Sequence, residues 1–290
     1  MKDWCYLFIA KLTGHCVALL PRKILLRIGC LFGSIVFKFS SHQRKIAYDN
    51  IRHSLNLDDE KLVKLYTKRC YQNLGKTVVE FMRFPKTSQK LIQEFVEFEG
   101  IHHIENALSL GNGAIILTGH FGNWELLAAS ISTKIAPLKP IVRELRSPRL
   151  NELVTKYRKK AGYSTIDRNT GVRDALRCLR TNNLLGIVAD VDTTVNGVFV
   201  DFFGRPAYTP YSPIAFALKT GAVILPSFII RQPDGSHQAI IEPPMELKQT
   251  DDKEKDIIEN TQKFTKIIET YIRKYPEQWI WMHERWKTQS

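Results

Sequence analysis

The sequence has few cysteines, and their spacing matches neither a disulfide framework nor a zinc site. Five occur among 290 residues, and no CxxC pair is present: Cys5, Cys16, Cys30, Cys70 and Cys178. Secreted disulfide-rich domains and zinc-ribbon proteins instead show even numbers at short, regular spacings. We therefore expect reduced thiols in a cytosolic setting, with several of them packed as small apolar side chains.

Long charge-free apolar runs are also missing from the amino-terminal region. Residues 4–39 are rich in apolar side chains, but the run from Ile28 to Phe37 has only ten residues, and charged residues interrupt the rest: Lys11, Arg22, Lys23, Arg27 and Lys38. A spanning helix needs about 20 apolar residues, and no small-residue cleavage site indicates a signal peptide. Two interpretations remain: amphipathic helices packed on the main domain, or a helix lying in a membrane interface.

Acidic residues are outnumbered. The chain has 29 Asp and Glu against 42 Lys and Arg, for a net charge of +13, and its first 50 residues carry eight basic residues against Asp3 and Asp49. Such an excess favours a polyanionic partner, which could be nucleic acid, an anionic membrane surface, a phosphorylated substrate or an acidic protein. With 44% hydrophobic residues, the chain can form a sizeable core, which excludes global disorder.

A GxSxG motif is absent, yet one strand-to-helix turn carries a candidate site. Residues 114–118 (AIILT) read as a buried strand, the polar cluster GHFGNWE at 119–125 follows, and LLAASIS then reads as a helix. In α/β sheets, sites are built at the carboxyl ends of strands. Because no cysteine lies near this turn either, a covalent serine or cysteine mechanism is disfavoured.

His120 and Glu125 in this turn suit acyl transfer to a hydroxyl. That reaction needs a base that is neutral near pH 7, and a carboxylate on the second ring nitrogen fixes the tautomer of the histidine. We expect Glu125 to fold back onto His120, while Gly119 and Gly122 permit close substrate approach. The alternative is a histidine that merely satisfies the turn. HxxxxE has no second nearby His or Cys, so we expect no metal.

Further polar residues follow the next predicted strands. Arg143 comes directly after residues 139–142, and residues 139–160 contain eight basic and two acidic side chains. This stretch is either a solvated helix face or, with Arg143 and Arg146, a phosphate clamp. The strand at 184–189 delivers Asp190 and Asp192 to its carboxyl end, where they could cap a turn, pair with an arginine or contact the acceptor.

The remaining pattern predicts an α/β fold, with a central mixed sheet flanked by helices. We expect strands at 223–230 and 238–241 joined by the Pro-Asp-Gly turn 233–235, and helices at about 58–82, 172–180 and 254–274. The aromatic stretch 195–210 could line an acyl-chain groove or belong to the core. Likewise, the tryptophans near the carboxyl end could form an interfacial belt or a packed lid.

Three blocks in this order resemble one family. GHFGNWE (119–125), VADVDTTVNGVFVDFFGRPAYTP (188–210) and YPEQWIWMHERWK (275–287) are similar to the late acyltransferases of lipid A biosynthesis. That family lies within the lysophospholipid acyltransferase superfamily, whose signature is HxxxxD/E. The resemblance covers nearly the whole chain, including KIAYDNIRHSL at 45–55.

The resemblance implies transfer of an acyl group from acyl carrier protein to the 3-hydroxyl of an acyl chain on a Kdo-bearing lipid A precursor, without a cofactor. It implies a location at the cytoplasmic face of the bacterial inner membrane, with residues 1–45 as a membrane-associating helical segment and 46–290 as the catalytic α/β domain. The family's catalytic residues map onto His120 and Glu125. We expect substrate contacts from a further set: Gly122, Asn123, Arg143, Arg146 and Asp190.

Departures from the family and rival functions set the limits of this prediction. Arg22, Lys23 and Arg27 break up the amino-terminal helix, so we expect peripheral or shallow attachment, and Val191 leaves the role of Asp192 open. The same chemistry could act on another glycolipid or a lysophospholipid. A pI near 9.5 also invites a nucleic-acid-binding protein, but no helix-turn-helix, zinc-finger or RNA-recognition signature occurs. Nucleic acid is therefore not an expected partner.

Overall fold

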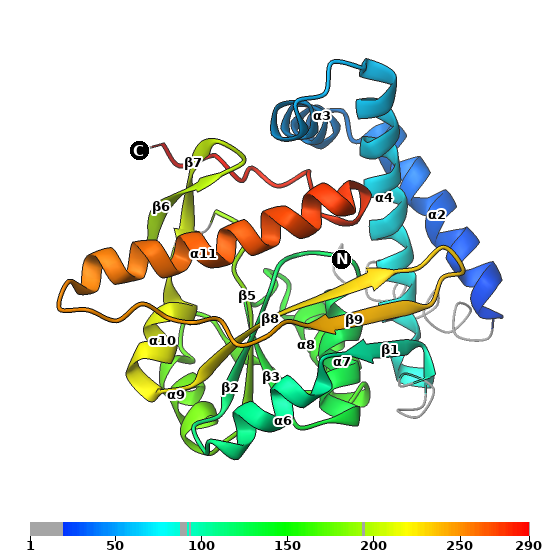
Figure 1. Ribbon diagram of the computed structural model, residues 1–290. Coiled ribbons are helices and arrows are strands. Elements are labelled where there is room, and N and C mark those ends of the chain that lie inside the picture. Colours follow the sequence, from blue (N-terminus) through cyan, green and yellow to red (C-terminus); the bar gives the residue numbers. More distant parts are fainter. Residues whose placement is uncertain (1–19, 88–91, 93, 193–194, 290) are drawn as a thin grey trace.

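The computed structural model describes residues 20–87, 92, 94–192 and 195–289, and Figure 1 shows a central sheet with helices on both faces. The sheet contains seven strands in the order β1-β9-β8-β2-β5-β3-β4. All neighbouring pairs are parallel except β8 and β9. The predicted mixed sheet is thus confirmed, with these strands: β1 (Val96–Glu99), β2 (Ala114–Thr118), β3 (Leu138–Val142), β4 (Ile166–Asp167), β5 (Leu184–Val188), β8 (Val223–Arg231) and β9 (His237–Ile241).

Alternation along the strands divides the core into two layers. Ile115 and Leu117 of β2 pack with helices α9, α10 and α11, whereas Ile116 packs with α6 and α7 on the other face. Each central strand is buried on both faces, which explains its continuous apolar sequence. The helices of the two layers are α6 (Ile101–Ser109), α7 (Trp124–Lys134), α8 (Pro148–Lys160), α9 (Val172–Arg180), α10 (Ser212–Thr220) and α11 (Lys253–Lys274).

The aromatic stretch 195–210 forms an antiparallel hairpin of β6 (Gly197–Phe202) and β7 (Arg205–Pro210), packed against α11. Phe202 is buried, stacks on Trp286 and meets the Trp279 ring edge-on. Trp281 is also fully buried. Phe202 therefore belongs to the core, and Trp279 and Trp281 pack inside the protein and form no exposed belt.

Among the described residues, three α-helices precede the sheet: α2 (Arg22–Phe39), α3 (Ser41–Leu55) and α4 (Glu60–Arg83). The Asp59 carboxylate caps α4 by accepting from the Lys61 N–H at 2.8 Å, within a residue or two of the predicted start. The part of the predicted segment 1–45 that precedes residue 20 lies outside the described residues, and α3 continues across position 45. The division of the chain at that position stays a prediction.

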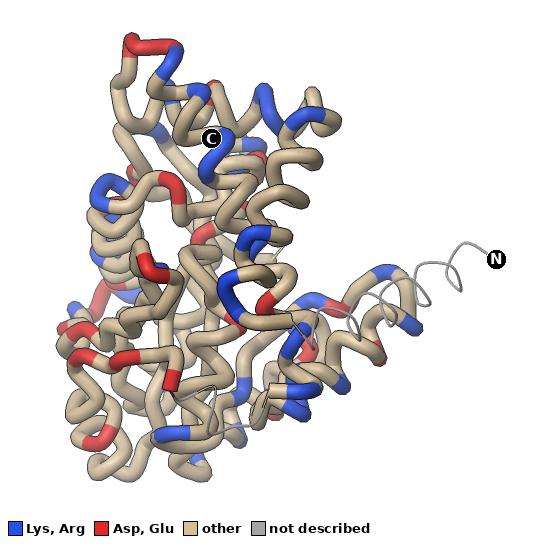
Figure 2. Tube along the Cα trace, turned by 90° about the vertical axis from the view of Figure 1, so that its right-hand side faces the viewer, with Lys and Arg blue, Asp and Glu red and all other residues tan. Residues whose placement is uncertain are grey.

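Helix α2 carries an exposed apolar stripe, with Leu31 62% and Phe39 78% exposed. The helix contains Lys and Arg but no Asp or Glu. Figure 2 shows the side of the molecule on which α2 lies, with basic residues in blue and acidic residues in red. Among the described residues, no single helix is both long enough and apolar enough to cross a membrane. Helices α2 and α3 reach that length and apolar character only together, and a 98° bend separates them. The predicted membrane attachment stays a prediction.

The cysteines within the described residues are free thiols. Cys70 and Cys178 are buried and Cys30 is partly exposed. Burial raises the pKa of the Cys70 thiol to about 12, so it stays protonated at neutral pH. These three residues fit the expected reduced, apolar packing, and Cys5 and Cys16 lie outside the described part of the chain.

Glycines bring α2 and α4 together, which gives a testable consequence. A Cβ at Gly33 would overlap the backbone carbonyl of Tyr71. We expect Gly33→Ala to lower the free energy of unfolding by about 1–3 kcal/mol, despite the better helix propensity of alanine. Ile35→Ala, at a side chain 48% exposed on the same helix, is the matched control. Denaturant unfolding measures both variants, and equal stabilities would contradict close backbone packing here.

Candidate active site

Strand register places His120 beside Asp190. Thr118, the last residue of β2, pairs with Val188, the last residue of β5. His120 and Asp190 each follow two residues after these paired positions. Both side chains therefore emerge at the carboxyl edge of the sheet, where sites of α/β proteins lie. The predicted strand-to-helix turn is confirmed, because α7 begins at Trp124 directly after it.

The two side chains form a buried hydrogen-bonded pair. His120 Nδ1 lies 2.8 Å from Asp190 Oδ1, the His120 backbone N–H donates to Oδ2 at 2.6 Å, and Trp279 Nε1 donates to the same oxygen at 2.6 Å. The Asp190 side chain is fully buried, whereas that of His120 is 24% exposed. Since a carboxylate only accepts, the imidazole proton belongs on Nδ1 and Nε2 is left as an acceptor.

Electrostatics strengthen this pair. Burial by itself would raise the pKa of Asp190, but the adjacent His120 and the N–H donors outweigh it and hold the pKa below its usual value. For His120, burial acts to lower the pKa, and the Asp190 charge, its hydrogen bond and the Glu125 charge overcome that effect and raise it. The ring is thereby prepared to carry a positive charge.

Glu125 does not occupy the place expected for it. Its carboxylate accepts from Arg158 Nε at 3.0 Å and Nη2 at 2.5 Å, and from the Tyr163 hydroxyl. The second ring nitrogen of His120 is bonded to Asp190 instead. The first turn of α7 directs Glu125 toward α8, whereas strand register brings in Asp190. Asp190 was expected to contact substrate, but both of its oxygens are already bonded within the protein.

Gly122 and Asn123 stabilise the turn through close packing and hydrogen bonds within the protein. Gly122 has a φ of 58°, and a Cβ there would overlap the Ile229 carbonyl oxygen. Asn123 is fully buried; its Oδ1 accepts from the Leu126 N–H as the cap of α7, and its Nδ2 donates to Glu80. Neither residue lines the cavity described below. The contacts seen here stabilise the turn, and the predicted substrate contact stays a prediction.

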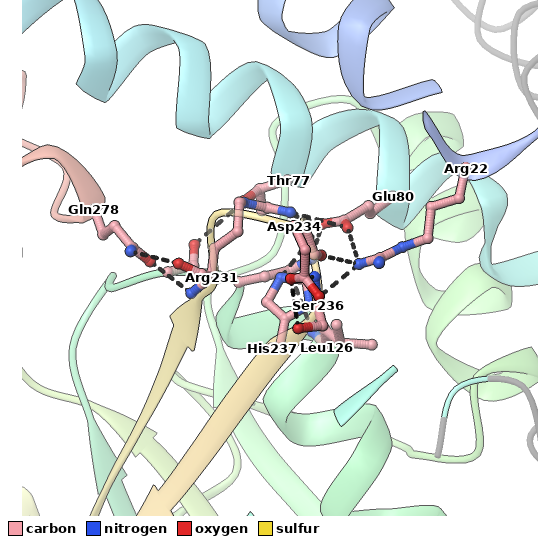
Figure 3. A network of polar contacts seen from close by, with 12 residues as sticks. Arg22, Thr77, Glu80, Leu126, Arg231, Asp234, Ser236, His237 and Gln278 are labelled. Atoms are coloured by element: carbon pink, nitrogen blue, oxygen red, sulfur yellow. Dashed lines mark hydrogen bonds and ion pairs between the residues drawn. The ribbon is translucent and has the colours of Figure 1, made fainter. Parts of the chain in front are cut away.

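Glu80, on α4, is the centre of a second buried network (Figure 3). Arg231 donates both terminal nitrogens to the Glu80 carboxylate, at 2.9 and 2.8 Å, and Arg22 adds a bond at 3.1 Å. Burial alone would raise the pKa of Glu80, but Arg231 and its other cationic neighbours hold it low. Gln278 bonds the Arg231 backbone in both directions. One carboxylate thus joins α2, α4, β8 and the turn that carries His120.

A cavity of about 1080 Å³ opens beside His120. Polar walls near the histidine include Glu125, Arg158 and Tyr163, and Arg143 also lines it. The predicted partner Arg146 is not among its lining residues. The inner walls are apolar and come from both layers of the core: Ile116, Leu127, Ala128, Leu138, Ile187 and Phe216.

Sequence reasoning did not single out four residues of this site: Arg158, Tyr163, Trp279 and His283. The ring centroid of His283 lies 5.3 Å from that of His120, and burial lowers the pKa of His283, which keeps it neutral. Trp279 and His283 belong to the block YPEQWIWMHERWK, which was a usable signal. Nothing local distinguishes Arg158 among the eight basic residues of 139–160.

Asp192 lies near the cavity but binds the chain's own carboxyl-terminal segment. Its carboxylate accepts from the Thr288 backbone N–H at 2.7 Å and from the Thr288 hydroxyl at 3.0 Å. These bonds tie the segment after β5 to the carboxyl-terminal segment, and the functional role of Asp192 stays open. Among the described residues, no group of three or more His, Cys, Asp or Glu side chains is placed to hold a metal ion.

In this α/β fold, a histidine bonded to a buried carboxylate lies at the carboxyl edge of parallel strands and faces an apolar cavity. A histidine in such an arrangement can act as a general base. The family follows from the sequence as a whole. The chain belongs to the bacterial lipid A biosynthesis acyltransferase family, whose model matches residues 1–288.

Individual relatives are distant but extensive. The lipid A biosynthesis lauroyltransferase of Escherichia coli is 25% identical over 276 residues, covering 94% of this chain and 88% of that protein. A phosphatidylinositol mannoside acyltransferase of Mycolicibacterium smegmatis is 25% identical over 211 residues, 71% of this chain and 67% of that protein. For the same enzyme of Mycobacterium tuberculosis, 27% identity extends over 54% of this chain and only 51% of that protein.

The Glu80–Asn123 contact can be tested by exchanging its partners. Glu80→Gln leaves the Arg231 guanidinium buried without its charge partner, so we expect a loss of about 3–5 kcal/mol in the free energy of unfolding. Asn123→Asp alone places two carboxylates together and should also destabilise. The double variant restores one carboxylate opposite one amide, with aspartate still able to cap α7.

Denaturant unfolding of the two single variants and the double variant gives the coupling energy. We expect the double variant to be more stable than the sum of the single losses predicts. Strict additivity would show that these two side chains do not act together.

Proposed function

We propose that the protein transfers a fatty acyl group from an acyl carrier protein thioester to a hydroxyl of a Kdo-bearing lipid A precursor. Membership in the lipid A acyltransferase family supports the acyltransferase class. The observation that carries the chemistry is the 2.8 Å hydrogen bond between His120 and Asp190 at the wall of an apolar cavity.

In this mechanism His120 is the general base. Its Nε2 accepts the proton of the acceptor hydroxyl, while Asp190 keeps the ring oriented and stabilises the imidazolium. The alkoxide oxygen bonds to the thioester carbonyl carbon, and the carbonyl becomes an oxyanion. When the carbonyl re-forms, the carbon–sulfur bond breaks, and His120 returns the proton to the departing thiolate. The products are an ester and a free thiol.

The amino end of α7 is suited to the oxyanion. The backbone N–H groups of His120, Phe121 and Gly122 already donate to Asp190, Gly119 and Gln278. At the start of α7, the Leu126 N–H is bonded to Asn123 Oδ1, whereas the helix dipole favours negative charge near the N–H groups of Trp124 and Glu125. We therefore propose these two N–H groups as the oxyanion donors.

Glu125 has a supporting role in this proposal. Its negative charge raises the pKa of His120 and so favours the imidazolium formed during the reaction. Through Arg158 and Tyr163 it also fixes one wall of the cavity. The apolar inner wall offers a place for the acyl chain, because Leu127, Leu138 and Phe216 present no polar side chain.

Charge and surface character support the proposed partners. Acyl carrier protein is acidic and the acceptor carries phosphates, so the net charge of +13 favours both encounters. The exposed apolar stripe and basic residues of α2 support shallow attachment to the anionic cytoplasmic face of the inner membrane. Relatives that are phosphatidylinositol mannoside acyltransferases favour one alternative, the same chemistry on another glycolipid.

The acceptor and the base are tested together. Purified protein in mixed micelles is given an acyl carrier protein thioester with a tetra-acylated Kdo lipid A precursor, a mannosylated phosphatidylinositol or a lysophospholipid. We expect acylation of the lipid A precursor, with at least about a 100-fold lower rate in His120→Ala. Preferential acylation of another acceptor would assign that lipid as the substrate in place of the lipid A precursor. Full activity of His120→Ala would refute His120 as the general base.

The pH dependence tests the role of Asp190. Protonated His120 cannot accept a proton, so the rate should fall as the pH drops through the raised pKa of His120, above the ordinary value of about 6.5. Asp190→Asn removes the raising charge and leaves the lowering effect of burial. Its acid limb should therefore move to lower pH, with a reduced maximal rate.

Initial rates between pH 5 and 9 measure this shift. Asp174→Asn is the control, since Asp174 is exposed and pairs with Arg177 on the same helix, α9. An acid limb at the same pH in wild type and Asp190→Asn would mean that Asp190 does not set the pKa of the base.

A further inference from the structure

Two arginines lie side by side at the mouth of the cavity. Val142 of β3 pairs with Asp167 of β4, and Arg143 and Arg168 are the next residue of each strand. The Arg168 backbone N–H donates to the Val142 carbonyl oxygen at 2.8 Å, which keeps the two chain segments together. Both arginines line the same cavity as His120.

In the described part of the chain, neither guanidinium group is directly paired, and Asp167 interacts with the Arg168 charge without forming an ion pair. Among the described residues, neither Arg143 nor Arg168 forms a side-chain hydrogen bond or an ion pair, and Arg168 Nε is buried without a partner. Arg158, in the same cavity, is by contrast bound to Glu125. Burying a guanidinium N–H group without an acceptor is costly. Arg143 is exposed, whereas Arg168 is partly buried with its Nε unpartnered, so the Arg168 donor indicates a ligand that supplies oxygen atoms.

Asp167 does not fill this role. Its Oδ1 accepts from the backbone N–H groups of Asn169 and Thr170 and from the Thr170 hydroxyl, which fixes the loop after β4. Its Oδ2 is buried and unpartnered, and the carboxylate makes no ion pair with either arginine. One carboxylate among two arginines leaves a net positive charge at this part of the mouth.

From this arrangement, and resting on the proposed acyl transfer, we propose that Arg143 and Arg168 form a phosphate-binding subsite for one of the two substrates. Planar guanidinium groups match phosphate oxygens in a bidentate manner, and two of them can enclose one phosphate. The ligand chemistry is a phosphate ester. It can come from a phosphate on the sugar of the acceptor or from the phosphodiester of the carrier's pantetheine arm.

This subsite changes the clamp expected from sequence. Arg143 and Arg146 share a chain segment, but Arg146 is not among the lining residues of the cavity. Arg168 follows a two-residue strand that comes after α8, and only the pairing of β3 with β4 brings it beside Arg143. The subsite lies at the same sheet edge as His120, so a bound phosphate would position a substrate relative to the base.

Steady-state kinetics of Arg143→Gln and Arg168→Gln test the subsite, with Arg177→Gln as control because Arg177 lies exposed on α9. Each variant is assayed with phosphorylated and dephosphorylated acceptor, and with acyl-phosphopantetheine and acyl-pantetheine. Loss of a charged hydrogen bond should raise the KM for one phosphorylated substrate about 10- to 100-fold, with little change in kcat. The matching phosphate-free substrate should show the same KM in wild type and variants.

The arm that responds identifies the source of the phosphate. A response confined to the acceptor assigns its sugar phosphate, and one confined to the donor assigns the pantetheine phosphodiester. Arg168→Lys should retain part of the affinity, because it keeps the charge but loses the planar donor pair. The subsite would be overturned if the variants left the KM of both phosphorylated substrates unchanged. It would also be overturned if the KM rose equally for the phosphorylated and the phosphate-free substrates.

Binding measurements separate this subsite from the proposed reaction. In a His120→Ala background, tryptophan fluorescence reports the affinity for acyl-phosphopantetheine and for the phosphorylated acceptor without turnover. One outcome is that the double variant His120→Ala, Arg168→Gln binds a phosphorylated substrate more weakly than His120→Ala, while the wild type shows no acyl transfer. This result would support the subsite and refute the proposed reaction. Efficient transfer by wild type with unchanged binding in the double variant would refute the subsite alone.

Discussion

The buried carboxylate of Asp190 is the interaction on which the site depends. It accepts the His120 ring N–H, the His120 backbone N–H and the Trp279 indole N–H, and so joins the turn after β2, the end of β5 and the carboxyl-terminal segment. An isolated buried charge would cost several kcal/mol, but here both oxygens are bonded and a cation-forming partner is adjacent. The same contacts that stabilise this charge fix the histidine ring.

Glu80 supports the opposite side of the turn in a similar way. It engages Asn123 directly, and Arg231 and Arg22 compensate its charge. The turn that carries His120 therefore lies between two buried carboxylates, one bonded to its histidine and the other to its helix cap. Both tie the turn to segments distant in sequence, which limits motion of the base relative to the cavity.

Sheet register decides which polar residues meet. The pairing of β2 with β5 brings His120 to Asp190, and the pairing of β3 with β4 brings Arg143 to Arg168. Because these strands are parallel, every such pair emerges at one edge of the sheet. His120, Arg143 and Arg168 thus line a single cavity, and Asp190 is hydrogen-bonded to the histidine.

The sequence by itself determined the central strands, the main helices and the turn with His120, because apolar periodicity and turn residues act over short distances. It could not determine that Asp190 rather than Glu125 bonds the ring, that Asn123 faces Glu80, or that Arg168 rather than Arg146 lines the cavity with Arg143. Those choices depend on strand order, on register and on the direction in which the first turn of α7 points. Only the tertiary structure decides them, since a carboxylate 70 residues from His120 along the chain becomes its neighbour through one strand pairing.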